Sequence, residues 1–239
     1  MEYNFESDIK FLTGDKALRK SVGEINDIGC RRIMLVCDEM SERVGQIDDM
    51  FRQLNKELNI VEKFNRIGER ATVSDCEKAL RAFKSNDCDS ILAVGKKSAL
   101  AVAKAVKIML KDDVSFISNY RTCTVNNISS VRIPLIVVPT NLSSGTEASN
   151  FVRIYDTENN EIFEFDTCFA QTNLIILDPI MTDTLPPKTI AASGLYALAM
   201  SVMSLAAEEE VRPLAKVYYV TAINLLTENM KKCILQNKV

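Results

Sequence analysis

The residues best suited to chemistry lie in a small polar loop, Pro139 to Ser149, which follows the apolar run from Ile133 to Val138. A short run that is rich in β-branched residues and bounded by prolines predicts a buried strand. Small side chains and hydroxyl groups at the carboxyl end of a strand are what a nucleotide crevice needs. The loop therefore indicates a nucleotide as the class of ligand.

A second candidate is Asp38, which ends the basic and then apolar stretch 31–38. An acidic residue at the end of a strand in a nucleotide-binding fold can bond the two hydroxyl groups of a ribose. The same aspartate can instead cap the helix that follows the strand. The stretch alone leaves both roles open.

The chain contains no histidine. Imidazole is therefore excluded as a metal ligand, general base or proton shuttle, and Ser-His-Asp and Cys-His nucleophile systems are excluded with it. The seven cysteines are scattered and never spaced as CxxC. This usage argues against a disulfide framework or zinc knuckle and favours a reducing, cytoplasmic environment.

Composition excludes some classes of partner. The 239 residues include 29 basic and 32 acidic ones, giving a net charge of -3 with no strong basic tract, so we expect no nucleic-acid partner. The N-terminus lacks the basic and apolar regions of a signal peptide. The apolar stretch from Leu195 to Ala207 is interpreted as a core helix, too short to span a membrane. We therefore expect no membrane partner.

Strands and helices alternate along the first three quarters of the chain. This order predicts a mostly parallel, Rossmann-like sheet with helices on both faces, hence an α/β fold. Ser74 is the expected cap of the second predicted helix. The predicted strands are 31–38, 60–64, 90–94, 133–138 and 174–177, and the predicted helices are 47–58, 74–83 and 99–110.

The last part of the chain has a different pattern. Residues 151–155 and 161–165 alternate as strands around a polar turn and predict a hairpin. Helical patterns follow over 189–209 and 214–235, after a boundary marked by Pro179, Pro186 and Pro187. We therefore predict a nucleotide-binding-like α/β domain over 1–183 and a partial all-helical domain over 184–239.

Three motifs, in order along the chain, carry a resemblance to a known family. Pro139 to Glu147 is similar to a Pro-Thr-Thr-x-Gly-Thr-Gly-Ser-Glu loop. A second motif is similar to an LDP, LPP and Gly-Met-Asp-Ala-Leu series and consists of Leu177-Asp178-Pro179, Thr184 to Pro187 and Ala191 to Leu198. A third is similar to a Gly-Gly-Gly-Ser turn with a later Ala-Lys and consists of Val94 to Ser98 with Ala103-Lys104. Together these stretches resemble the iron-containing alcohol dehydrogenases, which include glycerol-dehydrogenase-like members.

The resemblance implies a nucleotide-binding α/β domain followed by an all-α domain, and NAD or NADP as the dinucleotide. By this resemblance Asp38 would meet the adenosine ribose, Gly95 and Ser98 the pyrophosphate, and Thr140 the nucleotide. Lys96 and Lys97 occupy positions where the family usually has glycine. Their bulk opposes a tight turn, whereas their charge could attract phosphate, including the extra phosphate of NADP.

The metal site implied by the resemblance is altered. The family binds iron or zinc through an aspartate and histidines of the helical domain, and this chain has Tyr196 and Met200 where the first aspartate and histidine would lie. Phenol and thioether groups are poor replacements for such ligands. The other ligands lie in helices beyond the position of Val239, so we expect a degenerate, C-terminally short member that does not bind the family metal.

The expected consequence is a protein that is noncatalytic as an isolated chain, because alcohol oxidation needs a Lewis acid to stabilise the alkoxide and a relay to remove its proton. One alternative is a dehydrogenase subunit that another chain completes. A second is an interaction scaffold, in which apolar faces of 189–235 pair with a second copy or a helical partner and give a dimer.

Overall fold

The computed structural model describes residues 8–54, 57–112, 117–118, 132–141, 145–207 and 212–236. The chain divides into two compact units, one formed by 1–140 and 146–181 and the other by 141–145 and 182–239. The sequence places a domain boundary between residues 183 and 184, close to the division after Met181. Leu142 to Ser144 of the polar loop, Glu209 at the end of a predicted helix, and Cys123 lie outside the described residues.

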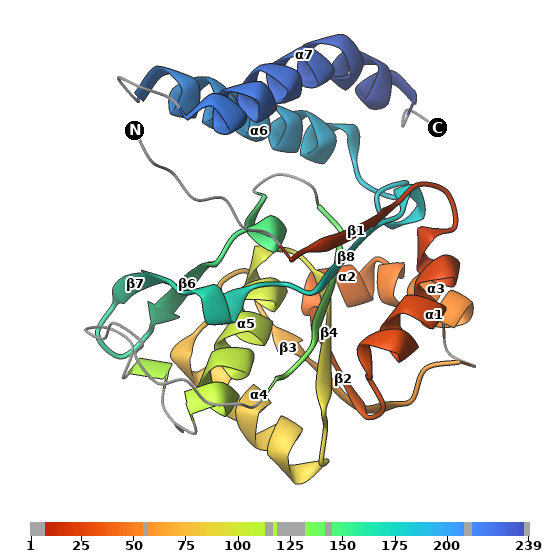
Figure 1. Cartoon of the computed structure of the whole chain (residues 1–239), viewed down its shortest axis with the longest axis vertical. Helices are drawn as coiled ribbons and strands as arrows, with labels where there is room; N and C mark the ends of the chain where they lie inside the picture. Colours follow the sequence, from red (N-terminus) through yellow and green to blue (C-terminus); the bar gives the residue numbers. More distant parts are fainter. Residues whose placement is uncertain are drawn as a thin grey trace. The chain divides into compact units, whose positions relative to one another are not determined.

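The first unit is built on a six-stranded sheet in which every neighbouring pair of strands is parallel (Figure 1). The strand order is β1-β8-β5-β4-β2-β3. This arrangement confirms the predicted α/β, Rossmann-like fold. The strands are β1 (Lys10–Thr13), β2 (Ile33–Asp38), β3 (Ile60–Ile67), β4 (Ser90–Gly95), β5 (Leu135–Pro139) and β8 (Leu174–Leu177).

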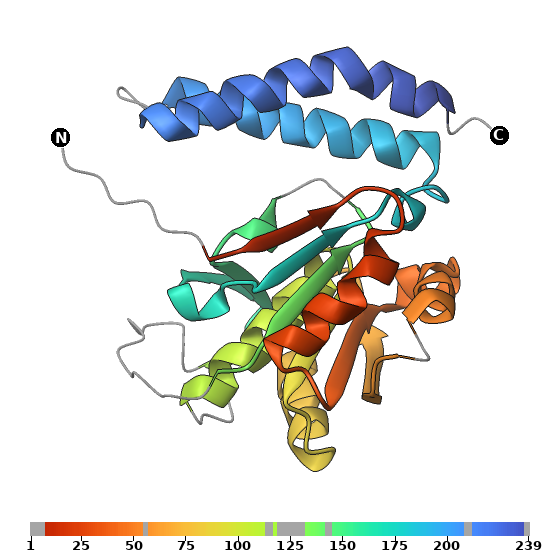
Figure 2. The same cartoon turned by 45° about the vertical axis from the view of Figure 1, so that its right-hand side comes forward.

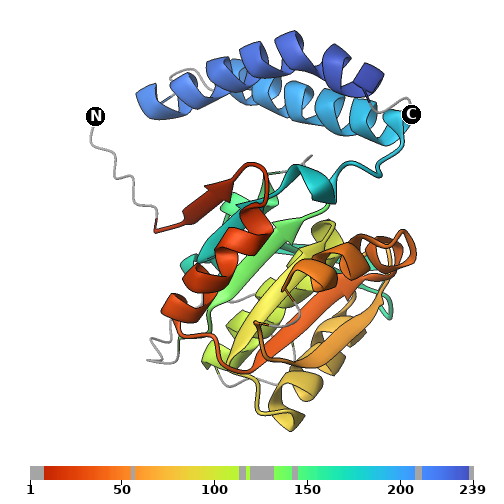
Figure 3. The same cartoon turned by 90° about the vertical axis from the view of Figure 1, so that its right-hand side faces the viewer.

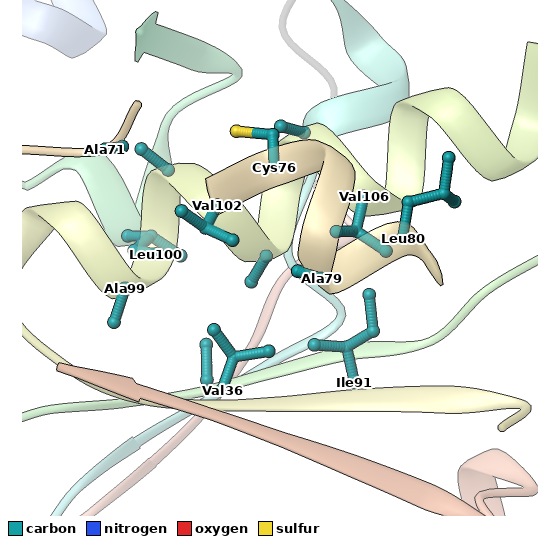
Figure 4. Packing of buried hydrophobic residues seen from close by; sticks show 14 of the residues in the cluster. Val36, Ala71, Cys76, Ala79, Leu80, Ile91, Ala99, Leu100, Val102 and Val106 are labelled. Carbon is teal, nitrogen blue, oxygen red and sulfur yellow. The ribbon is translucent and has the colours of Figure 1, made fainter. Parts of the chain in front are cut away.

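The central strands are apolar on both faces because helices cover both faces. Along β2, Met34 and Val36 pack in the cluster that contains helices α4 and α5, whereas Leu35 and Cys37 pack in the cluster that contains α1 and α3. Figure 4 shows Val36 and Ile91 of the strands facing side chains of α4 and α5. Figure 3 shows α1 on the opposite face of the sheet. The helices are α1 (Ala17–Ile28), α2 (Glu39–Arg43), α3 (Gln46–Leu54), α4 (Val73–Ser85) and α5 (Lys97–Asp112).

The cap of α4 differs from the prediction. Thr72, and not Ser74, precedes the helix, and its hydroxyl accepts a hydrogen bond from the Asp75 N–H at 3.1 Å. The Asp75 carboxylate in turn accepts from the Thr72 N–H at 3.1 Å. This reciprocal capping box satisfies two N–H groups at the start of the helix, whereas Ser74 lies within its first turn.

The connections on the two sides of β2 and β4 leave on opposite faces of the sheet. The chain leaves β2 through α2 and α3 to reach β3, and it leaves β4 through α5 to reach β5. Because α3 and α5 belong to the clusters on opposite faces, the adjacent strands β2 and β4 flank a topological switch point. The carboxyl ends of these strands are Asp38 and Gly95.

The predicted hairpin is confirmed as a separate two-stranded antiparallel sheet of β6 (Phe151–Asp156) and β7 (Glu161–Asp166). Its turn is held by Asp156, whose carboxylate accepts hydrogen bonds from the N–H groups of Glu158 at 2.9 Å and Asn159 at 3.2 Å. Val152 and Ile154 attach the hairpin to the cluster around α4 and α5. Short 3₁₀ turns lie at η2 (Thr146–Ala148), η3 (Cys168–Ala170) and η4 (Pro179–Met181).

The second unit is a helical hairpin of α6 (Pro187–Ala207) and α7 (Pro213–Gln236), which run side by side in opposite directions (Figures 1 and 2). A Cβ atom added at Gly194 would lie 2.7 Å from the Met230 sulfur, so the helices approach closely there. Ser193 of α6 donates a hydrogen bond to Asn141 Oδ1 at 2.6 Å, which ties α6 to the loop that follows β5.

The interpretation of 195–207 as a short core helix is wrong. The helix starts at Pro187 and none of its residues is buried, because a pair of helices covers each member along one side only. The helix α6 has 21 residues and contains an 18-residue window with a mean hydropathy of 1.7. Within the described residues it is the one helix that is long and apolar enough, by length and composition, to cross a membrane.

Candidate functional site

Asp38 lies at the end of β2 and is the N-cap of α2. Its Oδ1 accepts a hydrogen bond from the Ser41 N–H at 2.9 Å, and its Oδ2 accepts from the Ser41 hydroxyl at 2.9 Å and from the Lys96 N–H at 2.8 Å. The residue is 3% exposed. The capping role left open by the sequence is therefore present. The predicted ribose contact stays a prediction, for which a carboxylate with about four acceptor positions still has capacity.

Gly95 is the last residue of β4 and has a φ of +145°, a backbone conformation that residues with a side chain rarely adopt. A Cβ atom at this position would lie 2.1 Å from Asp38 Oδ2. The lack of a side chain at Gly95 therefore allows the carboxylate to reach the turn that begins α5.

Thr140 follows β5 and is fully buried. Its N–H donates to the Gly95 carbonyl oxygen at 3.1 Å, and its hydroxyl oxygen lies 3.0 Å from that of Ser41. Since the carboxylate of Asp38 can only accept, the Ser41 hydroxyl donates to Asp38 and accepts from Thr140. A chain of hydrogen bonds from Asp38 through Ser41 to Thr140 thereby joins the carboxyl ends of β2 and β5, and the bond from the Thr140 N–H to Gly95 joins them to the end of β4.

Ser41 is the member of this chain that the sequence analysis missed. The sequence signal that could have identified Ser41 is its position three residues after Asp38, because the side chain of an N-cap residue accepts a hydrogen bond from an N–H group at that spacing. Its pairing with Thr140, 99 residues away, leaves no mark in the local pattern.

Ser98 lies in the first turn of α5, apart from that chain. Its hydroxyl donates to the Gly68 carbonyl oxygen at 2.8 Å and the residue is 4% exposed. The structure therefore brings Asp38, Gly95 and Thr140 together and places Ser98 beside the loop after β3. Its predicted role at a pyrophosphate is untested by these contacts.

The start of α5 has the features of a phosphate site. The first helical hydrogen bond from this turn is donated by the Leu100 N–H to the Lys96 carbonyl oxygen at 3.2 Å, so the preceding N–H groups have no partner within the helix. The positive end of the helix dipole and the side chains of Lys96 and Lys97 add positive charge there. These residues fit the pyrophosphate of a dinucleotide.

The cysteine at the carboxyl end of β2, Cys37, is not an activated nucleophile. Burial raises the pKa of the Cys37 thiol, the one nearest Asp38 in the chain, to about 12. A neutral thiol neither attacks substrates nor binds hard metals. The site is therefore suited to binding through hydrogen bonds and phosphate contacts.

The metal positions implied by the resemblance lie on α6, where Tyr196 is 43% exposed and Met200 is 45% exposed. The described part of the chain contains no group of three or more histidine, cysteine, aspartate or glutamate residues placed to hold a metal ion. A phenol and a thioether do not fit iron or zinc as replacements for a carboxylate and an imidazole.

A parallel sheet with this order, with polar residues at a switch point, defines a Rossmann-like α/β protein. Residues 9–179 match the family model described as iron-containing alcohol dehydrogenase. The chain belongs to the iron-containing alcohol dehydrogenase family.

Relatives and solved structures agree with this assignment. Long-chain-alcohol dehydrogenase 1 of Geobacillus thermodenitrificans is 24% identical over 91% of this chain and 54% of its own length. The fold is similar to that of sulfoacetaldehyde reductase from Bifidobacterium kashiwanohense in complex with NAD⁺ (TM-score 0.87, 18% identity, 99% of this chain and 62% of that one). It is also similar to NADH-dependent butanol dehydrogenase A from Thermotoga maritima (TM-score 0.83, 18% identity, 97% and 57%). The chain thus spans about half the length of the curated relatives it matches.

Proposed function

We propose that this chain binds NAD or NADP at the carboxyl edge of β2, β4 and β5 and that, by itself, it does not oxidise alcohols. The observation that carries the proposal is the convergence of Asp38, Gly95 and Thr140 at the switch point of the sheet. Family membership and the NAD⁺ complex of the sulfoacetaldehyde reductase support the choice of ligand.

Each group of residues has a separate task in this proposal. Asp38 accepts a hydrogen bond from a ribose hydroxyl while its other contacts hold it in place. The N–H groups at the start of α5, with Lys96 and Lys97, bind the pyrophosphate. Thr140 donates to Ser41, so its hydroxyl can only accept a hydrogen bond from the ligand. A bound dinucleotide would supply the hydride acceptor or donor.

The proposal that the chain does not oxidise alcohols is argued from the residues that replace the metal ligands of the family. Without histidine in the chain, and with Tyr196 and Met200 on α6, these positions offer no Lewis acid to a substrate oxygen. Stabilisation of developing charge commonly supplies about 3–4 kcal/mol from a single donor, so loss of the metal lowers the rate by orders of magnitude.

A second candidate is a dehydrogenase subunit that works with a further polypeptide. The named relatives are matched over 54% to 62% of their own lengths. Tyr196 and Met200 argue against it, because a partner cannot replace residues within α6.

The test is calorimetric titration of the chain with NAD and with NADP, each with and without Fe²⁺ or Zn²⁺. The proposal expects binding that Ser98→Ala and Thr140→Val weaken and that metal ions do not change. Ser90→Ala is the matched control, because Ser90 is also buried but lies at the amino end of β4. No binding of either dinucleotide would overturn the proposal, and metal-dependent alcohol oxidation would favour the second candidate.

A further inference from the structure

Lys104 is a lysine of α5 with no exposed surface. Its ammonium nitrogen donates to the carbonyl oxygens of Thr146 at 2.6 Å, Ser149 at 2.6 Å and Phe151 at 3.4 Å. A lysine is almost never fully buried unless its charge is compensated. The three donor hydrogens of an ammonium group match three acceptors from a single short segment.

That segment is the second half of the polar loop after β5, which includes η2 and leads into β6. A second side-chain anchor among the described residues is Thr172, whose hydroxyl donates to the Glu147 carbonyl oxygen at 2.7 Å. Within the segment, the Ser149 N–H and hydroxyl groups both donate hydrogen bonds to the Thr146 carbonyl oxygen. The Thr146 carbonyl oxygen is therefore shared between the loop's own turn and the lysine.

The charges around the ammonium come from three elements. Burial lowers the pKa of Lys104 to about 8, opposed by the carboxylates of Glu147 on η2 and Asp166 on β7 and assisted by Lys107 on α5. Burial also raises the pKa of Glu147, against the attraction of Lys104 and Lys97. The buried positive charge is thus compensated by hydrogen bonds to three carbonyl oxygens and by the attraction of the Glu147 and Asp166 carboxylates.

We propose that Lys104 is the positioning residue of the 145–151 loop, an internal cation that gathers three carbonyl oxygens and holds the loop beside the carboxyl end of β5. The role in ligand binding rests on the proposed function, because this loop continues from Thr140. The structural role is independent of any ligand. Removal of the side chain leaves a cage of carbonyl oxygens that a small alkylammonium ion fits.

The experiment follows hydrogen–deuterium exchange of the full chain with Lys104→Ala, and with Lys78→Ala as control, since Lys78 is an exposed lysine on α4. Exchange in 145–151 is expected to accelerate on the order of tenfold or more in Lys104→Ala, while β2 and β4 stay protected. Propylammonium chloride should restore protection, whereas propan-1-ol, of similar size but neutral, should not. Unchanged exchange in 145–151, equal acceleration throughout the sheet, or equal rescue by the alcohol would overturn the proposal.

A second variant covers the case in which Lys104→Ala does not fold. Lys104→Gln keeps two N–H donors without the charge, and exchange in 145–151 should lie between those of the wild type and a fully released loop. Wild-type exchange in this variant would show that the charge is not needed and overturn the proposal.

Dinucleotide titration of the same variants separates the two proposals. If the wild type binds NAD or NADP, Lys104→Ala should raise Kd on the order of tenfold, and propylammonium should restore it. If the wild type binds neither, the proposed function fails, while the exchange experiment still decides the role of Lys104.

Discussion

The carboxylate of Asp38 and the backbone N–H of Lys96 are joined by a 2.8 Å hydrogen bond across the switch point between β2 and β4. The oxygen that accepts this bond occupies the space that a side chain at position 95 would need. The helix cap, the cross-strand bond and the glycine are therefore one coupled feature, and its parts should not behave independently on mutation.

Gly95→Ala should destabilise the chain by about 2–4 kcal/mol, because it combines a positive φ with a 2.1 Å approach to Asp38 Oδ2. The free energy of unfolding in urea measures this. In an Asp38→Ala background the clash is absent, so the same change should cost less. Gly23→Ala, in α1 with open space around the added methyl group, is the control and should stabilise by up to about 1 kcal/mol. Additive costs would show that Gly95 and Asp38 are not coupled.

Ser41→Ala should cost about 1–3 kcal/mol of unfolding free energy, because it removes one of the three hydrogen bonds to the buried Asp38 carboxylate and takes away the acceptor of the buried Thr140 hydroxyl. Thr140→Val in the same background should then cost less than it does alone, which a double-mutant cycle in urea measures. Ser74→Ala, at an exposed site, should change stability by less than about 0.5 kcal/mol. Equal losses of unfolding free energy in Ser41→Ala and Ser74→Ala would show that Ser41 does not bridge Asp38 and Thr140.

The fold was predictable because the central strands β2, β4 and β5 are short apolar runs, as burial on both faces demands, and helical patterns follow β2 and β4. The site was predictable in part: Asp38 and Thr140 stand at strand ends, but an acidic residue between a strand and a helix suits a cap as well as a ligand. The partners that decide these roles are distant in sequence, as Lys96 is from Asp38 and Phe151 is from Lys104.

The two predictions that differ from the structure, the cap of α4 and the burial of α6, also have physical explanations. Serine and threonine are both favourable N-cap residues, so the sequence allows Ser74 or Thr72 in this position. Thr72 is the cap in the structure, where its N–H also donates a hydrogen bond to the Asp75 carboxylate. The sequence predicts α6 as a core element because hydropathy measures how apolar a helix is. It carries no information on whether other residues cover the helix, and none of the residues of α6 is buried.

Alkaline pH should weaken the fold through its buried thiols. The pKa of Cys37 is raised from 9.0 to about 12, first by desolvation, and that of Cys88 to about 11 for the same reason. Above pH 9 the unfolded chain loses these protons while the folded chain keeps them, so stability falls as the pH rises. Cys37 alone accounts for up to ~4 kcal/mol by pH 12. Urea unfolding from pH 8 to 10 should show a shallower decline in Cys37→Ala than in the wild type or in Cys168→Ala, an exposed control. Parallel declines would contradict the assignment.

Lys107 should act in the opposite direction. Its ammonium donates to the Gln171 carbonyl oxygen at 2.5 Å and to Asn173 Oδ1 at 3.2 Å, and desolvation, with Lys111, lowers its pKa to about 8. Between pH 8 and 10.5 the unfolded chain binds the proton that the folded chain has lost, so this residue raises stability with pH, by up to ~3 kcal/mol. The wild-type minus Lys107→Met difference in unfolding free energy should therefore grow across this window, and Lys78→Met should give a flat difference.

Self-association of the purified chain is the last expectation, and it concerns the helical unit. Of the fifteen exposed large apolar side chains described, eleven lie on α6 and α7. At the close contact between the helices the small residue Gly194 faces Met230, whereas Met203 is 64% exposed and Val217 is 61% exposed.

Apolar surface of this extent is rarely left in water, and in a purified sample the surface available to cover it is that of a second copy. Light scattering should therefore give a mass above 26.7 kDa, rising with concentration. Met203→Glu with Val217→Glu should shift the mass toward the monomer, because burying two carboxylates opposes the contact. Lys216→Glu, which places the same charge at an exposed polar position of α7, should leave the association in place. A wild-type monomer at all concentrations would show that these faces do not pair with each other.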